Sequence, residues 1–400
     1  MPNPILSPVY HISPLTWVKK NLFSTWYNIL LTFISILFLY WIGSGLIHWS
    51  FDQAQWEVVG ANLRLFFVGR YPVTLLWRTW LSLGIITTLA GFSWGILYCR
   101  TKLFNRAALG LICLLAVGFS LLAIPVSVRS SLSLLGLLIL LIISGWKGQK
   151  LGQEFPGLKT WLGLTWVSTF FVILLVLQGG LFFQTVKLDD LSGLMLTLLT
   201  AVVSITLSFP FGVLLALGRQ NDLLVVRWLS IAYIEIIRGL PLIGILFMVQ
   251  VMLPLVLPME VRLDRVIRAI AGLTLFSSAY LAENIRGGLQ SIPKGQIEAA
   301  RALGLNTIFV STLIVLPQAL KAVIPTIVGQ FISLFKDTSL LAIVGLVDLL
   351  GISQSILANP KFIGRYAEVY LFIAVIYWLF CYLMSLASRQ LEQKLNTSKT

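Results

Sequence analysis

Charged side chains inside apolar runs are the residues of this 400-residue sequence best suited to do chemistry. Lys336 and Asp337 are adjacent in a largely apolar run from residue 317 to 350, and Thr338 and Ser339 follow them. A charge inside a membrane-spanning helix is costly and by default marks a pathway for an ion or a polar solute. We expect this segment to line such a path or its gate, or to pair with another subunit. The alternative is a lysine that only reaches the membrane surface.

Two further pairs combine a glutamate and an arginine three positions apart, at the ends of apolar runs. They are Glu235 with Arg238 and Glu283 with Arg286. Side chains three positions apart are neighbours on a helix, so ion pairing within each helix is the simpler interpretation. The second interpretation is a role in the inner gate of a path, or in fixing the polar loop that follows the second pair.

A polar stretch, "SIPKGQIEAARALG", lies between two long apolar runs. Pro293 suits the first turn of a helix, Ser291 is a suitable cap for that turn, and Gly304 suits the left-handed residue that ends a helix. The stretch therefore predicts a short polar helix that docks on a partner. The alternative is a solvated hairpin in which Glu298 pairs with Arg301.

Several kinds of chemistry are excluded by what the sequence lacks. Its two histidines and three cysteines are too scattered for a metal cluster, a redox pair or a disulfide framework. The phosphate-binding pattern G-x-x-x-x-G-K-[ST] is missing, so this chain does not hydrolyse ATP alone. No H-E-x-x-H or G-x-S-x-G pattern supports an enzyme embedded in the membrane. We expect neither a metal nor a cofactor in this chain, and no enzymatic activity.

The elements that position these residues follow from composition. The chain is 58% hydrophobic, 11% charged and has a mean hydropathy of +0.92, values typical of a protein that crosses the membrane many times. A transmembrane helix needs about 20 mostly apolar residues. We therefore predict an all-α polytopic membrane protein with about ten spans, over residues 21–51, 79–99, 107–128, 130–146, 160–186, 191–218, 239–259, 266–282, 317–350 and 369–388.

The distribution of basic residues predicts the orientation. If both termini are cytoplasmic, the inner loops of a ten-span arrangement hold more Lys and Arg than the outer loops, as expected for a membrane protein. Orienting charge and contact with anionic lipid then explain the net charge of +14 without nucleic acid. The outer loop at 52–78 contains "WEVVGANLRLFFVGRYP", which favours either a packed loop or a short helix lying along the interface.

The polar stretch gains a specific interpretation from its spacing. Glu298, Ala299 and Ala300 are followed by Gly304 and, after nine residues, by Ile314, with Leu316 and Pro317 next. This spacing resembles the EAA---G---------I-LP signature of permeases in ATP-binding-cassette (ABC) importers. The flanking "SAYLAENIRGGLQSIPKGQ" and "VLPQALKAVIPTIVGQFISLFKDTSLLAIVG" resemble the polar amino acid uptake branch of that superfamily.

The resemblance covers about residues 191–389 and implies a five-helix permease core within 187–400. The preceding five spans, in residues 1–186, are similar to an extension found in the larger subunit of general amino acid importers. The resemblance implies that the loop at 287–317 holds a coupling helix, in which the seven signature residues dock on a cytoplasmic ATPase. Lys336, Asp337, Thr338, Ser339 and the two Glu–Arg pairs then lie near a path or gate.

The resemblance also implies the setting of the protein. We expect a bacterial inner membrane permease that receives polar, acidic or neutral amino acids from an extracytoplasmic binding protein. Its partners would be a dimer of ATPase subunits, which hold the ATP and Mg²⁺, and a second permease subunit or a second copy of this chain. The alternative function is an ion-coupled secondary transporter, which would use buried carboxylates and would leave the docking loop unexplained.

Overall fold

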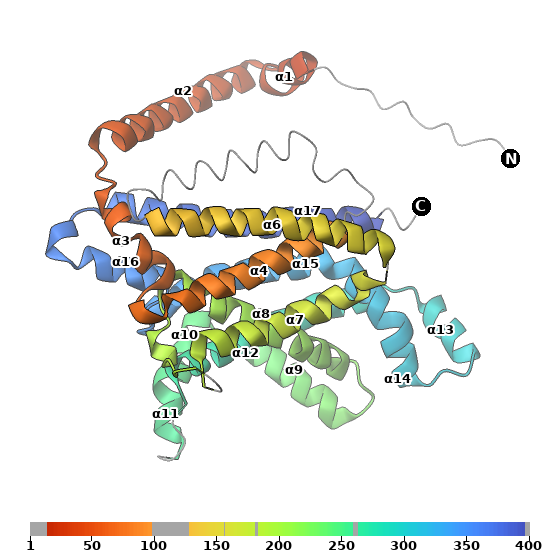
Figure 1. The fold of residues 1–400 in the computed structure, drawn as a ribbon. Coiled ribbons are helices and arrows are strands. Elements are labelled where there is room, and N and C mark those ends of the chain that lie inside the picture. Colours follow the sequence, from red (N-terminus) through yellow and green to blue (C-terminus); the bar gives the residue numbers. More distant parts are fainter. Residues whose placement is uncertain (1–13, 98–127, 156, 181–182, 259–262, 397–400) are drawn as a thin grey trace. The chain divides into compact units, whose positions relative to one another are not determined.

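The structure is a computed structural model that describes residues 14–97, 128–155, 157–180, 183–258 and 263–396. The chain divides into two compact units, residues 1–56 and 57–400, and each is described by itself. Figure 1 shows that the second unit is a bundle of long helices. The regular elements of the described residues are helices, apart from one isolated bridge between Gly193 and Asp348.

The first unit contains α1 (Pro14–Leu22) and α2 (Trp26–His48), which continues into the π-helical turn η1 (Trp49–Gln53). Helix α2 is apolar on all sides and none of its residues is buried within its own unit. A helix of this kind has to face lipid or another protein. It corresponds to the first span predicted from the sequence.

The second unit holds the remaining helices. They are α3 (Glu57–Val68), α4 (Leu76–Leu97), α6 (Val128–Glu154), α7 (Leu158–Gln178), α8 (Gly193–Arg219), α9 (Leu224–Gly239), α10 (Leu242–Phe247), α11 (Leu253–Val256), α12 (Arg265–Gln290), α13 (Lys294–Ala302), α14 (Thr307–Phe309), α15 (Leu316–Asp337), α16 (Leu349–Leu357) and α17 (Tyr366–Asn396). Short turns η2 to η7 connect several of them: Val73–Leu75, Leu188–Asp190, Met248–Met252, Val310–Val315, Thr338–Ala342 and Pro360–Phe362.

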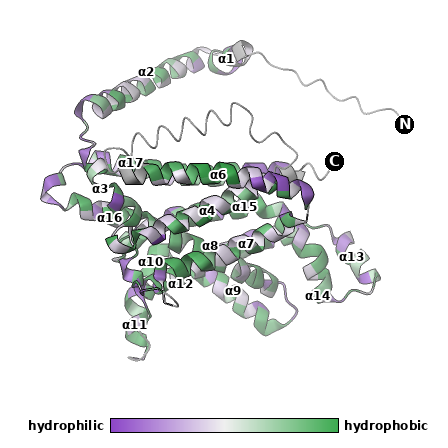
Figure 2. Ribbon diagram, viewed as in Figure 1, coloured by the Kyte–Doolittle hydropathy of each residue, from purple (hydrophilic) through white to green (hydrophobic). Residues whose placement is uncertain are grey.

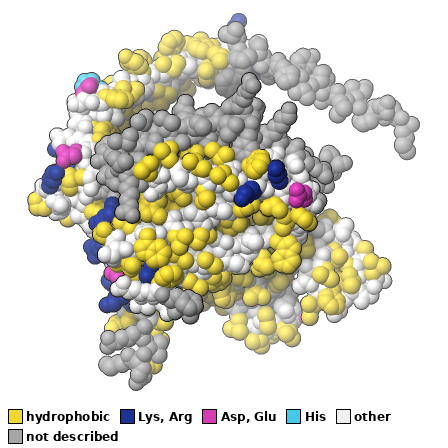
Figure 3. Space-filling model, in the orientation of Figure 1, with side chains coloured by type: hydrophobic (Ala, Val, Ile, Leu, Met, Phe, Trp, Pro, Cys, Tyr) yellow, Lys and Arg dark blue, Asp and Glu magenta, His cyan; other side chains and the backbone are white. Residues whose placement is uncertain are grey.

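Eight helices of the described residues are long and apolar enough to cross a membrane. A ninth span results if α9 and the helices that follow it, which bend by 104°, are counted as one broken span. The predicted span at 107–128 lies outside the described residues. Figures 2 and 3 show hydrophobic residues along the helices of the bundle and charged ones toward its ends, as expected for a protein surrounded by lipid.

Polar residues at the starts of helices satisfy free backbone N–H groups. The Asp264 carboxylate accepts from Val266 N at 2.8 Å at the start of α12. At the start of α16 the Asp348 carboxylate accepts from Gly351 N at 2.9 Å and from Leu350 N at 3.2 Å. Each bond replaces one that water would make outside the membrane, so these residues fix where the two helices begin.

Helix α12 is the centre of the bundle, because it packs against α8, α9 and α15. Gly212 of α8 allows a close approach, since a Cβ atom at this position would lie 2.7 Å from Leu281 Cβ. Buried hydroxyl groups on α8, such as those of Thr197 and Thr200, donate to carbonyl groups of the same helix. Small residues and satisfied hydroxyl groups are the usual means of packing helices tightly in a membrane.

Helices α4 and α6 pack side by side and run in the same direction. Positions Gly84, Gly91 and Gly95 of α4 face residues 137, 144 and 145 of α6 in the same order, and Figure 1 shows the same parallel course. Leu97 and Val128, the ends of the two helices that the intervening chain connects, therefore lie at opposite ends of the pair.

Glycine at position 95 is expected to be essential for this contact. In Gly95→Ala the new Cβ atom would lie 2.3 Å from the carbonyl oxygen of Gly145 and 2.6 Å from Gln149 N, and neither backbone atom can yield easily. Overpacking of this kind costs about 1–3 kcal/mol. The thermal midpoint of the purified protein should fall. Gly84→Ala is the matched control, because its Cβ atom would meet only Leu137 at 3.9 Å; equal midpoints for both variants would contradict this packing.

For the loop at 52–78 the sequence favoured either a short helix along the membrane interface or a packed loop. The structure shows a helix that packs in the protein core. Val58, Val59 and Phe66 of α3 are buried in a core cluster with residues of α8, α16 and α17. The phenolic O–H group of Tyr71 donates to Leu177 O at 2.8 Å. Helix α3 is therefore part of the same core as the C-terminal helices. The domain boundary predicted between residues 186 and 187 stays a prediction.

Candidate functional site

The polar stretch after α12 forms a short helix, as predicted. Helix α13 extends beyond the end of the bundle, opposite the end where α3 and α16 lie, and it is among the more hydrophilic helices (Figures 1 and 2). Gly304 follows it with φ of +82°, which confirms the predicted left-handed residue. The capping prediction was wrong in detail. Pro293 is the residue before the helix, and the Ser291 hydroxyl donates to Gly288 O at 2.7 Å, at the end of α12.

The seven signature residues divide into an exposed group and a packed group. Glu298 and Ala299 on α13, Gly304 and Pro317 are exposed. Ala300 is 4% exposed and belongs to a core cluster with Val310 and Val315. Ile314 and Leu316 pack against the same cluster. The packed group therefore holds α13 onto η5 and the start of α15, and only the exposed group is free to meet another protein.

Apolar side chains beside α13 are exposed and were missed by the sequence analysis. Leu303 and Ile308 are 83% and 71% exposed, and Phe309 and Leu313 are exposed as well. They follow α13 directly in the chain, on the segment that leads into α15. Exposed apolar residues next to a polar helix are typical of a protein interface. Their position in the sequence could have indicated this exposure. They lie next to or after Gly304, in a loop that is too short to be a span.

Helices α8, α9 and α12 are joined by a cluster of ion pairs around one carboxylate. Glu283 of α12 is 15% exposed and accepts hydrogen bonds from Arg219 at 2.7 Å and from Arg286 at 2.9 Å. Arg238 of α9 lies 3.4 Å from the same carboxylate. Arg219 also contacts Glu235 of α9 at 2.9 Å. We call these five residues the arginine cluster.

The arginine cluster confirms one of the two predicted pairs and corrects the other. Glu283 and Arg286 pair within α12, as their spacing predicted. The pairing of Glu235 with Arg238 was wrong, because among the described residues each pairs with another helix, Glu235 with α8 and Arg238 with α12. Helix α9 packs against α12, which brings Arg238 to the Glu283 carboxylate. Spacing along one helix does not predict contacts between helices.

Helix α15 exposes a surface unlike that of a helix facing lipid. Its exposed residues are all polar, charged or small: Pro317, Gln318, Lys321, Ala322, Thr326, Gly329 and Lys336. No large hydrophobic side chain is exposed between residues 316 and 337, all of which the structure describes, whereas α8 exposes Phe211 and Leu214. Exposed lysine and threonine are costly in hydrocarbon. The exposed face of α15 therefore faces either a polar path or a second protein.

The four residues at the end of α15 differ in their surroundings. Lys336 is exposed, and Asp337 is half-buried without a hydrogen bond or ion pair to any described residue. Thr338 is fully buried, and its hydroxyl donates to Phe335 O at 2.6 Å. Ser339 is partly buried. The structure thus leaves Lys336 and Asp337 available to a solute or a second subunit, whereas Thr338 stabilises the turn that ends the helix.

Comparison with known proteins shows the family. Residues 208–397 match the model of the binding-protein-dependent transport system inner membrane component. The inner membrane amino-acid ABC transporter permease protein YhdY of Escherichia coli (strain K12) is 38% identical over 403 residues, which cover 96% of this chain and 94% of that protein. This chain is an ABC transporter permease.

Further comparisons extend over most of the permease. The glutamate/glutamine/aspartate/asparagine transport system permease protein BztC of Rhodobacter capsulatus is 37% identical over 424 residues, which cover 97% of this chain and 95% of that protein. A crystal structure of an amino acid ABC transporter with histidines aligns with 58% of this chain and 98% of its own, with 26% identity and a TM-score of 0.46.

Membership in the family decides between the functions that the sequence left open. ABC transporter permeases are transport subunits rather than enzymes, and a separate subunit hydrolyses ATP. The ion-coupled secondary transporter is therefore not supported. The matched residues begin in α8 and include α13 and α15, so the elements with the exposed polar features lie in the part of the permease that the family shares.

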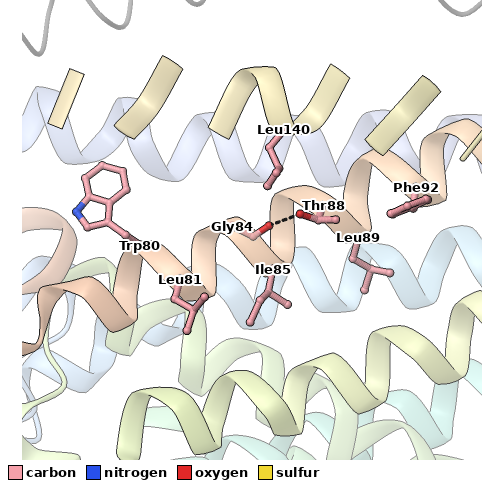
Figure 4. Close-up of a pocket in the computed structure, with 8 residues that line it drawn as sticks. All are labelled: Trp80, Leu81, Gly84, Ile85, Thr88, Leu89, Phe92 and Leu140. Carbon is pink, nitrogen blue, oxygen red and sulfur yellow. Dashed lines mark hydrogen bonds between the residues drawn. The ribbon is translucent and has the colours of Figure 1, made fainter. Parts of the chain in front are cut away.

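A groove on α4 of the permease has no comparable chemistry. Trp80, Leu81, Ile85, Leu89 and Phe92 line it with Gly84, Thr88 and Leu140 of α6, and Figure 4 shows the Thr88 hydroxyl bonded to the Gly84 carbonyl at 2.7 Å. The lining presents apolar side chains and one satisfied hydroxyl group. It suits a hydrocarbon surface better than a polar solute.

Proposed function

We propose that this permease carries amino acids across the bacterial inner membrane and that α13 is the coupling helix on which a cytoplasmic ATPase docks. The observation that carries the proposal is α13 itself, a polar helix beyond the end of an apolar bundle with Glu298 and Ala299 exposed. Ala299 allows close approach of another protein and Glu298 can pair with a basic group there. The exposed Leu303 and Phe309 add apolar area to the same surface.

The packing around α13 supports a route for mechanical coupling. Ala300 is buried against η5, and Leu316 at the start of α15 packs in the same cluster. Protein interiors are close-packed and transmit displacement, so α13 and the first turns of α15 should move together. Closure of two ATPase subunits around ATP and Mg²⁺ would then shift α15, whose far end carries Lys336.

The exposed face of α15 is our candidate for the translocation path. It has the polar and small residues that a path or a second permease subunit requires, and it ends at Lys336, Asp337, Thr338 and Ser339. The arginine cluster is our candidate for the gate at the other end of the bundle, where the last residue of α8 meets the last turns of α9. The bend of 104° between α9 and the helices after it is the kind of break that substrate paths use.

The substrates and partners proposed here follow from the family and from two relatives. YhdY is named as an amino-acid permease and BztC as a permease for glutamate, glutamine, aspartate and asparagine, which supports polar or acidic amino acids as cargo. A binding-protein-dependent system implies an extracytoplasmic binding protein. We further propose a second permease subunit or a second copy as the partner across the path, and cytoplasmic termini, as the distribution of basic residues predicts.

The function is tested by uptake into proteoliposomes that contain the permease, its candidate permease partner and the ATPase. With a binding protein outside, a labelled panel of the twenty amino acids should show accumulation that requires ATP inside the vesicles. Uptake that persists without the ATPase would overturn the proposal, and so would the failure of all twenty to enter.

Lys336→Met is expected to reduce uptake about tenfold or more without loss of assembly, because it removes the exposed charge at the end of α15 but keeps a long side chain. Initial uptake rates, corrected for the amount of assembled transporter, measure the effect. Lys361→Met is the matched control, because this exposed lysine lies outside α15 and pairs with Glu57 at 2.9 Å. Equal uptake by the Lys336→Met variant and the unmodified permease would show that Lys336 only reaches the membrane surface.

A further inference from the structure

Arg238 is the member of the arginine cluster that is held least firmly. Arg219 and Arg286 both donate hydrogen bonds to Glu283, Arg219 one at 2.7 Å and Arg286 three between 2.9 and 3.2 Å. Arg238 approaches the same carboxylate only to 3.4 Å and makes no hydrogen bond to a described residue. Since a guanidinium carries five N–H donors in a planar fork, the donors of Arg238 remain available.

Arg238 has one further contact, which leaves its N–H donors free. Its guanidinium carbon lies 5.6 Å from the ring centroid of Tyr280, a cation–π contact that favours one placement of the group without using its N–H bonds. It is the second-last residue of α9, just before the bend of 104°, and its side chain is 35% exposed. Arg238 is thus oriented, accessible and placed where the broken span changes direction.

The charges of the arginine cluster do not balance. Three guanidinium groups, of Arg219, Arg238 and Arg286, face two carboxylates, of Glu235 and Glu283, so the cluster carries one positive charge in excess. The cluster is partly buried at the end of the bundle, where an uncompensated charge costs less than at the centre of the membrane but still favours a bound anion. Of the three arginines that share this excess charge, Arg238 has the most exposed side chain and is the one without a hydrogen bond to a described residue.

We propose that Arg238 binds the carboxylate of the amino acid in transit. It would form a binding site at the ATPase side of the path, in addition to the candidate path residues at the end of α15. This inference rests on the proposed function. The two N–H groups of one edge of the guanidinium would hold the carboxylate in a bidentate pair. A charge-assisted pair of this kind is stronger than a hydrogen bond between neutral groups. Glu283 stays bonded to Arg219 and Arg286 throughout, so binding requires only that Arg238 exchange a weak contact for a strong one.

The proposal predicts discrimination between an amino acid and its α-carboxamide, which has the same shape without the negative charge. The probe is the amino acid with the highest uptake in the panel of twenty, used beside its carboxamide. Binding of both is measured on the complete transporter without the binding protein, so that the permease alone discriminates. A charge-assisted bidentate pair corresponds to roughly a 10- to 100-fold preference for the acid.

Arg238→Gln is expected to bring that preference close to one, and Arg238→Lys, which keeps the charge but loses the fork, to reduce it several-fold. Arg227→Gln is the matched control. It removes an arginine from the same helix whose Nε group donates to Asn221 O at 2.9 Å, and it should leave the preference unchanged. Because Arg238→Lys keeps the charge that the cluster contains, it remains informative if Arg238→Gln does not assemble.

Three results would overturn the proposal: no preference for the acid in the unmodified transporter, an unchanged preference in Arg238→Lys, or an equal loss in the Arg227→Gln control. These are distinct from failure of the proposed function, in which none of the twenty amino acids is taken up. A fourth result would also overturn the proposal. If Arg238 is found to pair with a carboxylate of a partner subunit, its substitution acts on assembly, and Arg238 does not bind the amino acid in transit.

Discussion

Glu298→Arg is expected to release the ATPase from the permease and to lower ATP-dependent uptake by about tenfold or more. The glutamate is exposed on α13, and reversing its charge would place two cations against each other at a docked surface, which costs several kcal/mol. The fold should tolerate the change, because no hydrogen bond or ion pair joins Glu298 to another described residue. Co-purification of the ATPase and uptake by proteoliposomes measure the two effects.

Gln296→Arg is the matched control for this prediction. It adds the same side chain at another exposed position of α13, outside the signature, and should retain most of the ATPase. Gly304→Arg gives a second route to the same loss, because a non-glycine residue at φ of +82° is strained by roughly 1–2 kcal/mol and would turn the chain after α13 differently. Normal co-purification with both Glu298→Arg and Gly304→Arg would refute the coupling helix.

Glu283→Gln should destabilise the permease more than any other single change in the arginine cluster. The substitution removes the charge that Arg219, Arg238 and Arg286 share and leaves three guanidinium groups facing Glu235 alone. Removing one partner of a fully buried ion pair costs about 3–5 kcal/mol because the other charge is left uncompensated, and the partial exposure of this cluster makes that figure an upper bound here. The thermal midpoint of the detergent-solubilised complex, followed by loss of monodisperse protein, measures the effect.

Glu235→Gln is the control that distinguishes the loss of the central carboxylate from the loss of any negative charge in the cluster. It removes one negative charge from the same cluster, but the Glu235 side chain is 54% exposed and its one ion pair among the described residues is with Arg219. An exposed pair of this kind contributes about 0–1 kcal/mol. A midpoint lowered equally by both variants would mean that net charge, and not the central position of Glu283, decides the stability of the cluster.

The helices of the fold were predictable because long apolar runs leave the backbone few alternatives in a membrane. Nine of the predicted spans correspond to a helix or a broken helix, and the left-handed conformation of Gly304 followed from its type and position. The packing of α3 was not predictable. Its apolar residues fit a membrane surface and a protein core equally well, and nothing local tells which helices of the C-terminal half will cover Phe66.

The contacts of charged residues could be predicted only within one helix. Glu283 and Arg286 pair as their spacing required, whereas Arg238 and Glu235 find partners 45 and 16 positions away, on other helices. Asp189, in the turn before α8, likewise pairs with a distant residue, Arg265 at the start of α12, at 3.1 Å. Such contacts depend on how helices pack, which a single sequence does not encode in any local pattern.

The exposed face of α15 has a local pattern that could have been recognised in the sequence. Ala322, Thr326, Gly329, Ser333 and Lys336 recur at intervals of three and four residues, which places small and polar side chains on one face of the helix. In a soluble protein this face would be ordinary. In a span it marks the side turned away from lipid, so the spacing alone extends the candidate path from Lys336 back along α15.

The place of α3 in the core sets an order of events during synthesis. Helix α3 begins at Glu57, but α16, which helps to cover it, begins only at Leu349. At 5–20 residues per second the ribosome needs roughly 15–60 s to make the chain between them. For much of that time α8 is the one helix of this core cluster that can cover α3, and the part of the apolar face that α16 and α17 cover stays open. The membrane insertion machinery or the lipid surface must shelter it, so a nascent chain arrested before α16 should be a preferred target for membrane proteases.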